Sequence, residues 1–410
     1  MRPSLILAGL AAALAGSPAL AEPLHGRISL ADQAAFNSSD SLDAALGDRA
    51  TNDALGDLRL TWEPRAGAWD FSVHYELGAE AGPGVATSRA EAAILGRAPP
   101  ATLLDLTGAV ADRDRLTIVH RIDRLAVGYS TPDWVVRVGR QALTWGAGTV
   151  FHPMDLVDPF APDAVDVDYK AGVDMIYVQK LFADGSDLQF IAAPRPARPG
   201  GPVEADASTF ALHYHGAAGA IGTTAMLARD HGDWTAAAGL SGPLGGAVWN
   251  LEIVPTWLDG RAARLSLLAN VSDALALAGR NATVFAEYHR NGFGASGEPA
   301  LDALPAGLAE RIARGQAFTV SRDYLAAGIS LEWTPLLTLA PTLIANLDDG
   351  SAYLVGQATW SLSDDAVLIA GAQAPMGPGG TEYGGLPLSA GSAVRVAPAS
   401  RFYLQLRRYF

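Results

Sequence analysis

The chain ends on S-R-F-Y-L-Q-L-R-R-Y-F, residues 400–410, in which apolar and polar side chains alternate. Because successive side chains of a β-strand point to opposite faces, this stretch has one apolar and one polar face. Its length fits the roughly 9–11 residues that a tilted strand needs to cross a bilayer. The pattern predicts a membrane-crossing strand. An amphipathic strand of a soluble sandwich is the alternative.

The same ending resembles the C-terminal strand by which Gram-negative outer-membrane β-barrels are recognised for insertion. The resemblance implies that the last residue, Phe410, is an assembly signal and that the barrel-assembly machinery is a partner. Arg408 departs from the pattern, because it lies on the apolar parity. A long arginine near the headgroups can place its charge in water, so this departure is tolerable.

The other end of the chain has the layout of a secretory signal peptide. Arg2 precedes an apolar run over residues 5–16, and Ala19-Leu20-Ala21 forms a cleavage site. We therefore expect residues 1–21 to be removed near Ala21, leaving residues 22–410 as a single outer-membrane β-barrel. No later run of about 18 apolar residues suggests a membrane-spanning helix.

Composition narrows the class of protein further. The formal net charge of −14 argues against a nucleic-acid partner. Mean hydropathy is +0.16, yet the apolar residues are spread over short alternating stretches separated by Gly, Pro, Asp and Ser. This distribution is typical of a barrel embedded in outer-membrane lipid.

Alternating segments recur along the mature chain. In residues 69–77, aromatic and aliphatic side chains share one parity, and Asp70, His74 and Glu76 share the other. About eighteen segments fit, which predicts an all-β fold, a transmembrane antiparallel β-barrel. They lie near residues 24–31, 55–63, 69–80, 115–130, 134–144, 172–182, 186–194, 207–216, 219–230, 233–242, 246–258, 262–272, 281–290, 323–333, 336–347, 351–362, 366–376 and 400–410.

The connections between these segments alternate in length. Every second connection is short, and all the long ones fall in the other class, as expected for short periplasmic turns and long external loops. Sixteen strands is the alternative count, because segments 173–182 and 281–290 alternate poorly. Parity changes between Asp123 and Leu125, which indicates a bulge or an over-long strand.

A barrel of this size leaves an aqueous lumen. The strand positions that face the lumen carry charges of both signs. These charges either select a polar solute or pair with one another on a wall that water contacts. The histidines lack a convincing metal-ligand spacing, so we expect no metal and no cofactor. The strand-borne lumen candidates are Arg59, His74, Glu76, Arg137, Arg140, Glu252 and Arg264.

The loop over residues 145–171 differs from an ordinary external loop, because its apolar and aromatic side chains would seek burial. Two interpretations stay open: a loop folded into the lumen as a constriction, or a lid over the barrel mouth. In the first, an acidic ring would favour cations, with Asp155, Asp158 and Asp163 as main contributors. The candidate carboxylates are Asp155, Asp158, Asp163, Asp166 and Asp168.

The motif G-R-Q-x-x-x-W-G-x-G followed by F-x-P-M-D-L-x-x-P-F, within residues 139–160, resembles a family of largely uncharacterised proteobacterial outer-membrane β-barrels. That family is distantly similar to porins and to the alginate-export barrel of about eighteen strands. The specific match covers roughly residues 115–195. The resemblance implies passage of a solute such as an anionic polysaccharide or a lipid-like molecule. The acidic loop departs from what an exporter of anions would need, so this substrate does not carry over to the chain.

The sequence therefore predicts a porin-like channel or exporter that passes a small polar or charged solute by diffusion through a loop-constricted lumen. Two other classes stay open: a barrel enzyme such as a hydrolase or deacylase, and a non-conducting structural or adhesion barrel. We expect no enzyme, because neither G-x-S-x-G nor H-E-x-x-H occurs. Residues 301–316 have the spacing of a short amphipathic helix on an external loop.

Overall fold

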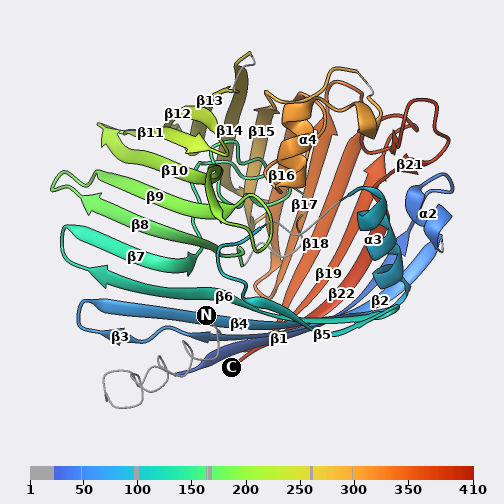
Figure 1. The fold of residues 1–410 in the computed structure, drawn as a ribbon, viewed down its shortest axis with the longest axis horizontal. Coiled ribbons are helices and arrows are strands. Elements are labelled where there is room, and N and C mark those ends of the chain that lie inside the picture. The colour runs from blue at the N-terminus through green and yellow to red at the C-terminus, as the bar shows by residue number, and fades with distance from the viewer. Residues whose placement is uncertain are drawn as a thin grey trace.

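The computed structural model describes residues 23–47, 49–96, 101–162, 164, 169–258, 262–297 and 299–410. These residues form a closed antiparallel β-barrel of 18 strands (Figure 1). The barrel closes because its first strand pairs with both the second and the last. The predicted signal peptide, residues 1–21, lies outside the described residues.

The barrel strands are β1 (His25–Phe36), β2 (Ala50–Trp62), β4 (Trp69–Ala81), β6 (Leu116–Ser130), β7 (Trp134–Gln141), β8 (Val173–Leu181), β9 (Asp187–Pro196), β10 (Val203–Ala218), β11 (Ile221–Asp230), β12 (Asp233–Leu244), β13 (Ala247–Trp257), β14 (Arg264–Leu277), β15 (Arg280–Arg290), β16 (Asp323–Thr334), β17 (Leu337–Asn346), β18 (Ala352–Ser363), β19 (Ala366–Met376) and β22 (Ser400–Tyr409). The connections hold β3 (Arg65–Ala66), β5 (Thr107–Arg113), β20 (Leu386–Pro387), β21 (Arg395–Val396), α2 (Leu42–Leu46), α3 (Pro83–Ile94), η2 (Leu301–Ala303) and α4 (Ala306–Ala313).

Strand β13 shows how the sequence sorts its side chains. Leu251 and Trp257 on one parity are 47% and 48% exposed, whereas Glu252 and Thr256 on the other are 4% and 3% exposed. An apolar outer face around a polar interior is the reverse of a soluble protein and suits a wall in contact with lipid. None of the helices in the described ranges is long and apolar enough to cross a membrane.

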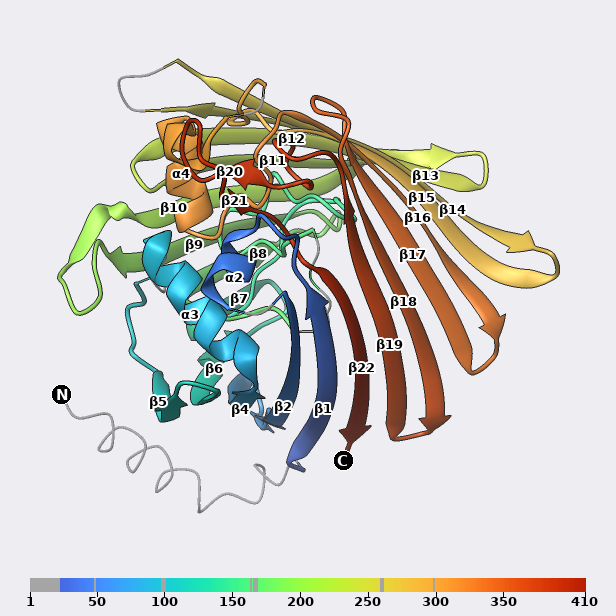
Figure 2. The same cartoon turned by 90° about the vertical axis from the view of Figure 1, so that its right-hand side faces the viewer.

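The alternation of short and long connections is confirmed. Residues 131–133, 245–246 and 278–279 make tight turns, and α2, α3 and α4 all lie in long connections at the opposite end of the barrel (Figure 2). Ala278 and Gly279 both have positive φ, 50° and 78°, which two-residue hairpins favour because this backbone matches the strand twist. Strand β22 ends beside the start of β1.

The predicted strand count of about eighteen is confirmed, and the alternative of sixteen is wrong. The parity change in β6 is a bulge: Arg124 pairs with His74 and Ile122 with Tyr75, which leaves Asp123 between them without a partner across the ladder. Several bounds differ from prediction. Strands β1 and β2 extend further into their shared connection, β5 was not expected, and the helix within residues 301–316 covers only Ala306–Ala313.

Candidate functional site in the barrel lumen

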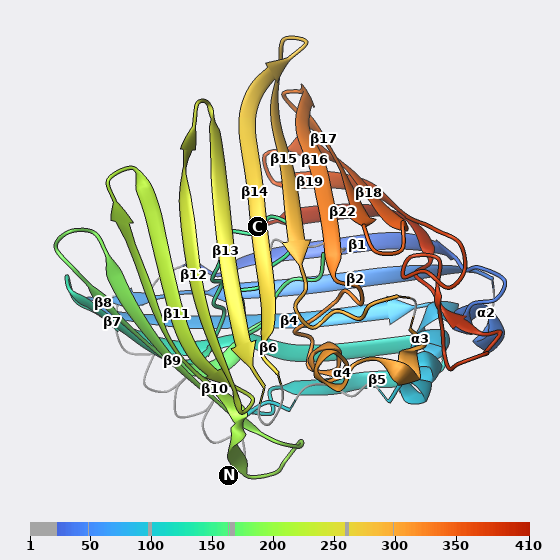
Figure 3. The same cartoon turned by 90° about the horizontal axis from the view of Figure 1, so that it is seen from above.

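The described residues of the connection 142–172, between β7 and β8, fold inward and cross to the wall formed by β13, β14 and β15 (Figure 3). The carboxylate of Glu287, on the inward face of β15, accepts three backbone hydrogen bonds from this segment, which we call the inward loop. Thr149 donates to Oε2 at 2.6 Å, and Val150 and Phe151 donate to Oε1 at 2.9 and 2.8 Å. Glu287 is 1% exposed, so these bonds hold the loop inside the barrel.

A second wall carboxylate holds the loop a few residues earlier. Glu252 on β13 accepts a hydrogen bond from the backbone of Ala147. Asn270 on β14 donates to the carbonyl of Ala147 at 2.8 Å and to Glu287 Oε2 at 3.0 Å. Three neighbouring strands thus fix residues 147–151, because each supplies a partner for a loop backbone group that is shielded from water.

Aromatic stacking and apolar packing complete the docking. The Trp145 ring stacks on His213 of β10 with centroids 4.8 Å apart, and its Nε1 donates to Gln189 Oε1 at 2.7 Å. Phe151 stacks on His289 of β15 at 4.7 Å. Met154 is fully buried in a core cluster with wall residues. These contacts join the loop to inward faces, which favours the constriction over the external lid.

The acidic residues of the loop have different surroundings. Asp155 is buried in an ion pair with Lys170, so its charge is compensated, and burial raises the pKa of Asp155 although Lys170 opposes this shift. Asp158 has no hydrogen-bond or ion-pair partner among the described residues, and burial raises its pKa to about 6. Asp163, Asp166 and Asp168 lie outside the described residues.

Across the lumen, β2, β4 and β6 carry a network of paired charges. Arg59 donates to Asp123 at 2.7 Å and to Glu76 at 2.9 Å. Arg121 contacts the same carboxylates, at 2.9 Å to Asp123 and 2.6 Å to Glu76. The bulge in β6 therefore has a structural role, because it turns the extra residue, Asp123, towards Arg59 and allows the ion pair between them. Most of the charge on this wall is neutralised in pairs.

Tyr169 attaches the far end of the loop to this network. Its ring lies under the guanidinium of Arg59, 3.4 Å from ring centre to Cζ, and its hydroxyl lies 2.5 Å from His74 Nδ1. Burial raises the pKa of Tyr169 to about 12, so the phenol stays protonated in its hydrogen bond with His74. Glu63 contacts the other ring nitrogen of His74 at 2.8 Å.

The other predicted lumen arginines lie apart from this network. Arg137 pairs with Asp70 at 3.1 Å, and its side chain keeps 37% exposure. Arg140 is buried against Asp174 at 2.9 Å and donates to the carbonyl of Leu104, so it joins β7 and β8 to the connection that precedes β5. Arg264 is the first residue of β14, at the rim.

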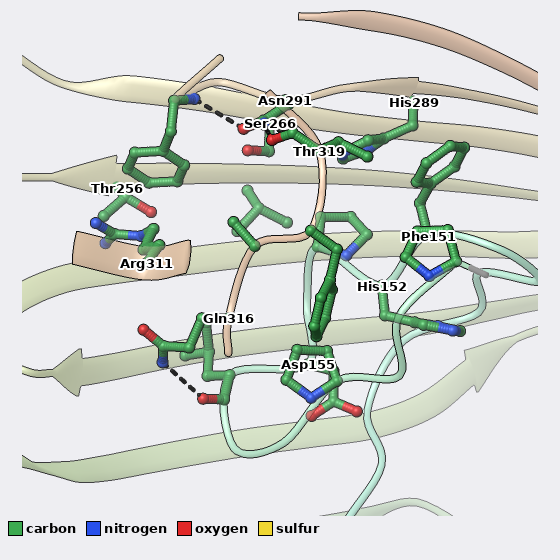
Figure 4. A pocket seen from close by; sticks show the side chains of 18 of the residues that line it. Phe151, His152, Asp155, Thr256, Ser266, His289, Asn291, Arg311, Gln316 and Thr319 are labelled. Carbon is green, nitrogen blue, oxygen red and sulfur yellow. Dashed lines mark hydrogen bonds between the residues drawn. The ribbon is translucent and has the colours of Figure 1, made fainter. Parts of the chain in front are cut away.

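A cavity of about 90 Å³ separates the inward loop from the connection 291–322 (Figure 4). Gln316 of that connection donates to the carbonyl of Leu156 at 2.9 Å and to Asp230 at 2.8 Å, and Arg311 of α4 pairs with Asp233 at 3.0 Å. The connection 291–322 therefore packs on the inward loop near Leu156. Among the described residues, no group of three or more possible ligands could hold a metal ion.

Sequence reasoning did not identify Glu287, Asn270 or Tyr169 as the residues that anchor the loop. No local motif could have shown it, because Glu287 and Phe151 are 136 positions apart. The signal that was available is the apolar character of the loop itself.

Solved structures of similar shape support this architecture. The chain superposes on OccAB2 of Acinetobacter baumannii with a TM-score of 0.58, at 9% identity over 96% of this chain and 99% of the other. OccK5 (OpdH) of Pseudomonas aeruginosa superposes with a TM-score of 0.55, at 8% identity over 95% of this chain and 99% of the other. The fold is that of outer-membrane β-barrels.

Wzi of Escherichia coli, described as a carbohydrate-binding β-barrel involved in group 1 capsule assembly, gives a TM-score of 0.54 at 8% identity, covering 99% of this chain and 88% of the other. No protein-family model matches the sequence, and no curated protein matches it. The outer-membrane location follows from the fold and from the exposed apolar belt of the barrel wall.

Proposed function

We propose that this barrel is a porin-like channel through which a small polar or charged solute diffuses past the inward loop. The observation that supports the proposal is the docking of residues 147–151 on Glu252 and Glu287, because it holds the loop inside the barrel, where it would narrow the lumen. Ion conductance of the purified protein in a planar bilayer tests it.

The wall retains polar groups that water can reach. The side chains of Arg121, Arg137 and His215 point inward and keep 40%, 37% and 55% exposure. A barrel plugged by its loops would bury such groups, as a packed interior does. This exposure supports a water-filled passage over a non-conducting structural barrel. The hydrolase alternative has no specific observation in its favour.

Selectivity should depend on Asp158 more than on Asp155, because Lys170 compensates Asp155. We expect weak cation preference at pH 8, where Asp158 is ionised, and its loss as the pH falls through about 6, where Asp158 becomes protonated. Asp158→Asn should shift the reversal potential in a salt gradient towards anions, with less effect at high ionic strength.

The matched control is the double variant D155N/K170M, which removes a buried pair without changing the net charge. It should leave the reversal potential where it is. A shift in the double variant equal to that of D158N, or none in D158N, would show that the selectivity arises elsewhere on the wall.

A further inference from the structure

A second cavity, of about 300 Å³, lies between residues 144–147 of the inward loop and the wall strands β9 to β13. Its floor follows one transverse row of paired residues. His215 pairs with Thr224, Thr224 with Gly239, and Gly239 with Glu252. Gly239 admits no side chain in the middle of this row, because a Cβ there would lie 2.3 Å from Thr224 Oγ1, so the Thr224 hydroxyl lies over the glycine.

Two side chains that line this cavity are buried without full hydrogen bonding. Glu252 uses Oε1 for the backbone of Ala147, while its Oε2 has no partner. Both ring nitrogens of His213 lack one as well. Each residue is 4% exposed. Burying unpaired polar atoms is unfavourable, so their presence around one cavity indicates a ligand that supplies hydrogen-bond donors.

The charge of the cavity decides which donor fits. Among the described residues that line it, Glu252 alone carries a formal charge, and no arginine or lysine is present. Asp187, which pairs with His215 at 3.4 Å, adds a second carboxylate beside the row. Hydroxyls of Thr224 and Ser241 are further acceptors. A negative cavity with acceptors and no competing cation favours a positively charged donor.

We propose that this cavity binds the primary ammonium group of a small solute. Glu252 Oε2 accepts one N–H, a neutral ring nitrogen of His213 or a wall hydroxyl accepts another, and the alkyl part of the solute occupies the rest of the cavity. The inference rests on the proposed function in one respect, since such a solute reaches the cavity through the lumen.

Equilibrium dialysis of the purified, detergent-solubilised barrel against radiolabelled ethylammonium tests this site. We expect saturable binding of one ion per barrel. Glu252→Gln keeps an acceptor for Ala147 but removes the charge, and should weaken binding at least about tenfold, the loss expected for a hydrogen bond between ions. Gly239→Val, whose Cβ fits only if the Thr224 hydroxyl is displaced, should abolish it. Glu332→Gln, on β16 and outside the cavity lining, is the control and should bind as the wild type does.

Unsaturable uptake, equal binding by wild type and E252Q, or glycerol binding as tightly as ethylammonium would overturn the inference. Heat-modifiable mobility on gels checks that each variant barrel is folded. Conductance separates this proposal from the last: saturable binding by a barrel that passes no current would refute the channel and leave the site. A conducting barrel without ethylammonium binding would refute the site alone.

Discussion

Excision of residues 150–165, with a short Gly-Ser linker in their place, should raise the single-channel conductance severalfold. The segment removed includes Phe151, Met154 and Asp155, all buried in the lumen against wall strands or against Lys170. Conductance rises with the narrowest cross-section of a pore, and an 18-stranded barrel without this loop is a wide aqueous tube. Single-channel recording in a planar bilayer measures the change.

A single side chain should reproduce part of this result. Glu287→Ala leaves the N–H groups of Thr149, Val150 and Phe151 without their acceptor, and a hydrogen bond to a charged group contributes about 1.5–3 kcal/mol. The loop should then undock for part of the time, giving larger and noisier current steps. Glu332→Ala, at an exposed position where the carboxylate contacts Asn281, is the matched control. Unchanged conductance in both the excision and E287A would place the constriction outside the inward loop.

Loss of Phe410 should prevent most of the chain from reaching the membrane. The backbone of Phe410 exchanges hydrogen bonds with Gly26, at 2.8 and 3.0 Å, and so completes the β1–β22 seam that closes the barrel. Its ring lies over Gly26, where a Cβ would come within 2.2 Å of it. We propose that this residue is also the assembly signal, so its deletion removes both recognition and closure.

Pulse-chase labelling with membrane fractionation measures the effect. The truncated chain and Phe410→Asn should accumulate in the periplasm, while Phe410→Tyr, which keeps the aromatic ring, should insert at close to the normal rate. Insertion of the truncated chain at the full rate would refute the assignment of Phe410.

The sequence was sufficient to predict the strands, because each one must alternate apolar and polar side chains to separate lipid from water. This alternation can be recognised within a single segment of the chain. It applies in β4 and β13, where parity is strict. It fades outside the membrane zone, which is why β5 and the outer ends of β1 and β2 were missed or shortened. Even the bulge at Asp123 could be seen, since an extra residue reverses parity.

The site was harder to predict because its partners are distant in the chain. Nothing near Asp155 shows that Lys170 neutralises it, and nothing near Glu252 or Glu287 shows that their carboxylates bind backbone groups of the loop. A charged residue at a strand position that faces the lumen is predicted to lie inside the barrel. Whether that charge faces water or a partner depends on how the inward loop folds.

Single-channel recording of the unmodified protein, purified and inserted into a planar bilayer, tests the central claim most directly. We expect discrete current steps that are small for a barrel of 18 strands, because the inward loop narrows the lumen. Insertion of folded barrels without any current steps would contradict it, and would favour a barrel closed by its own loops.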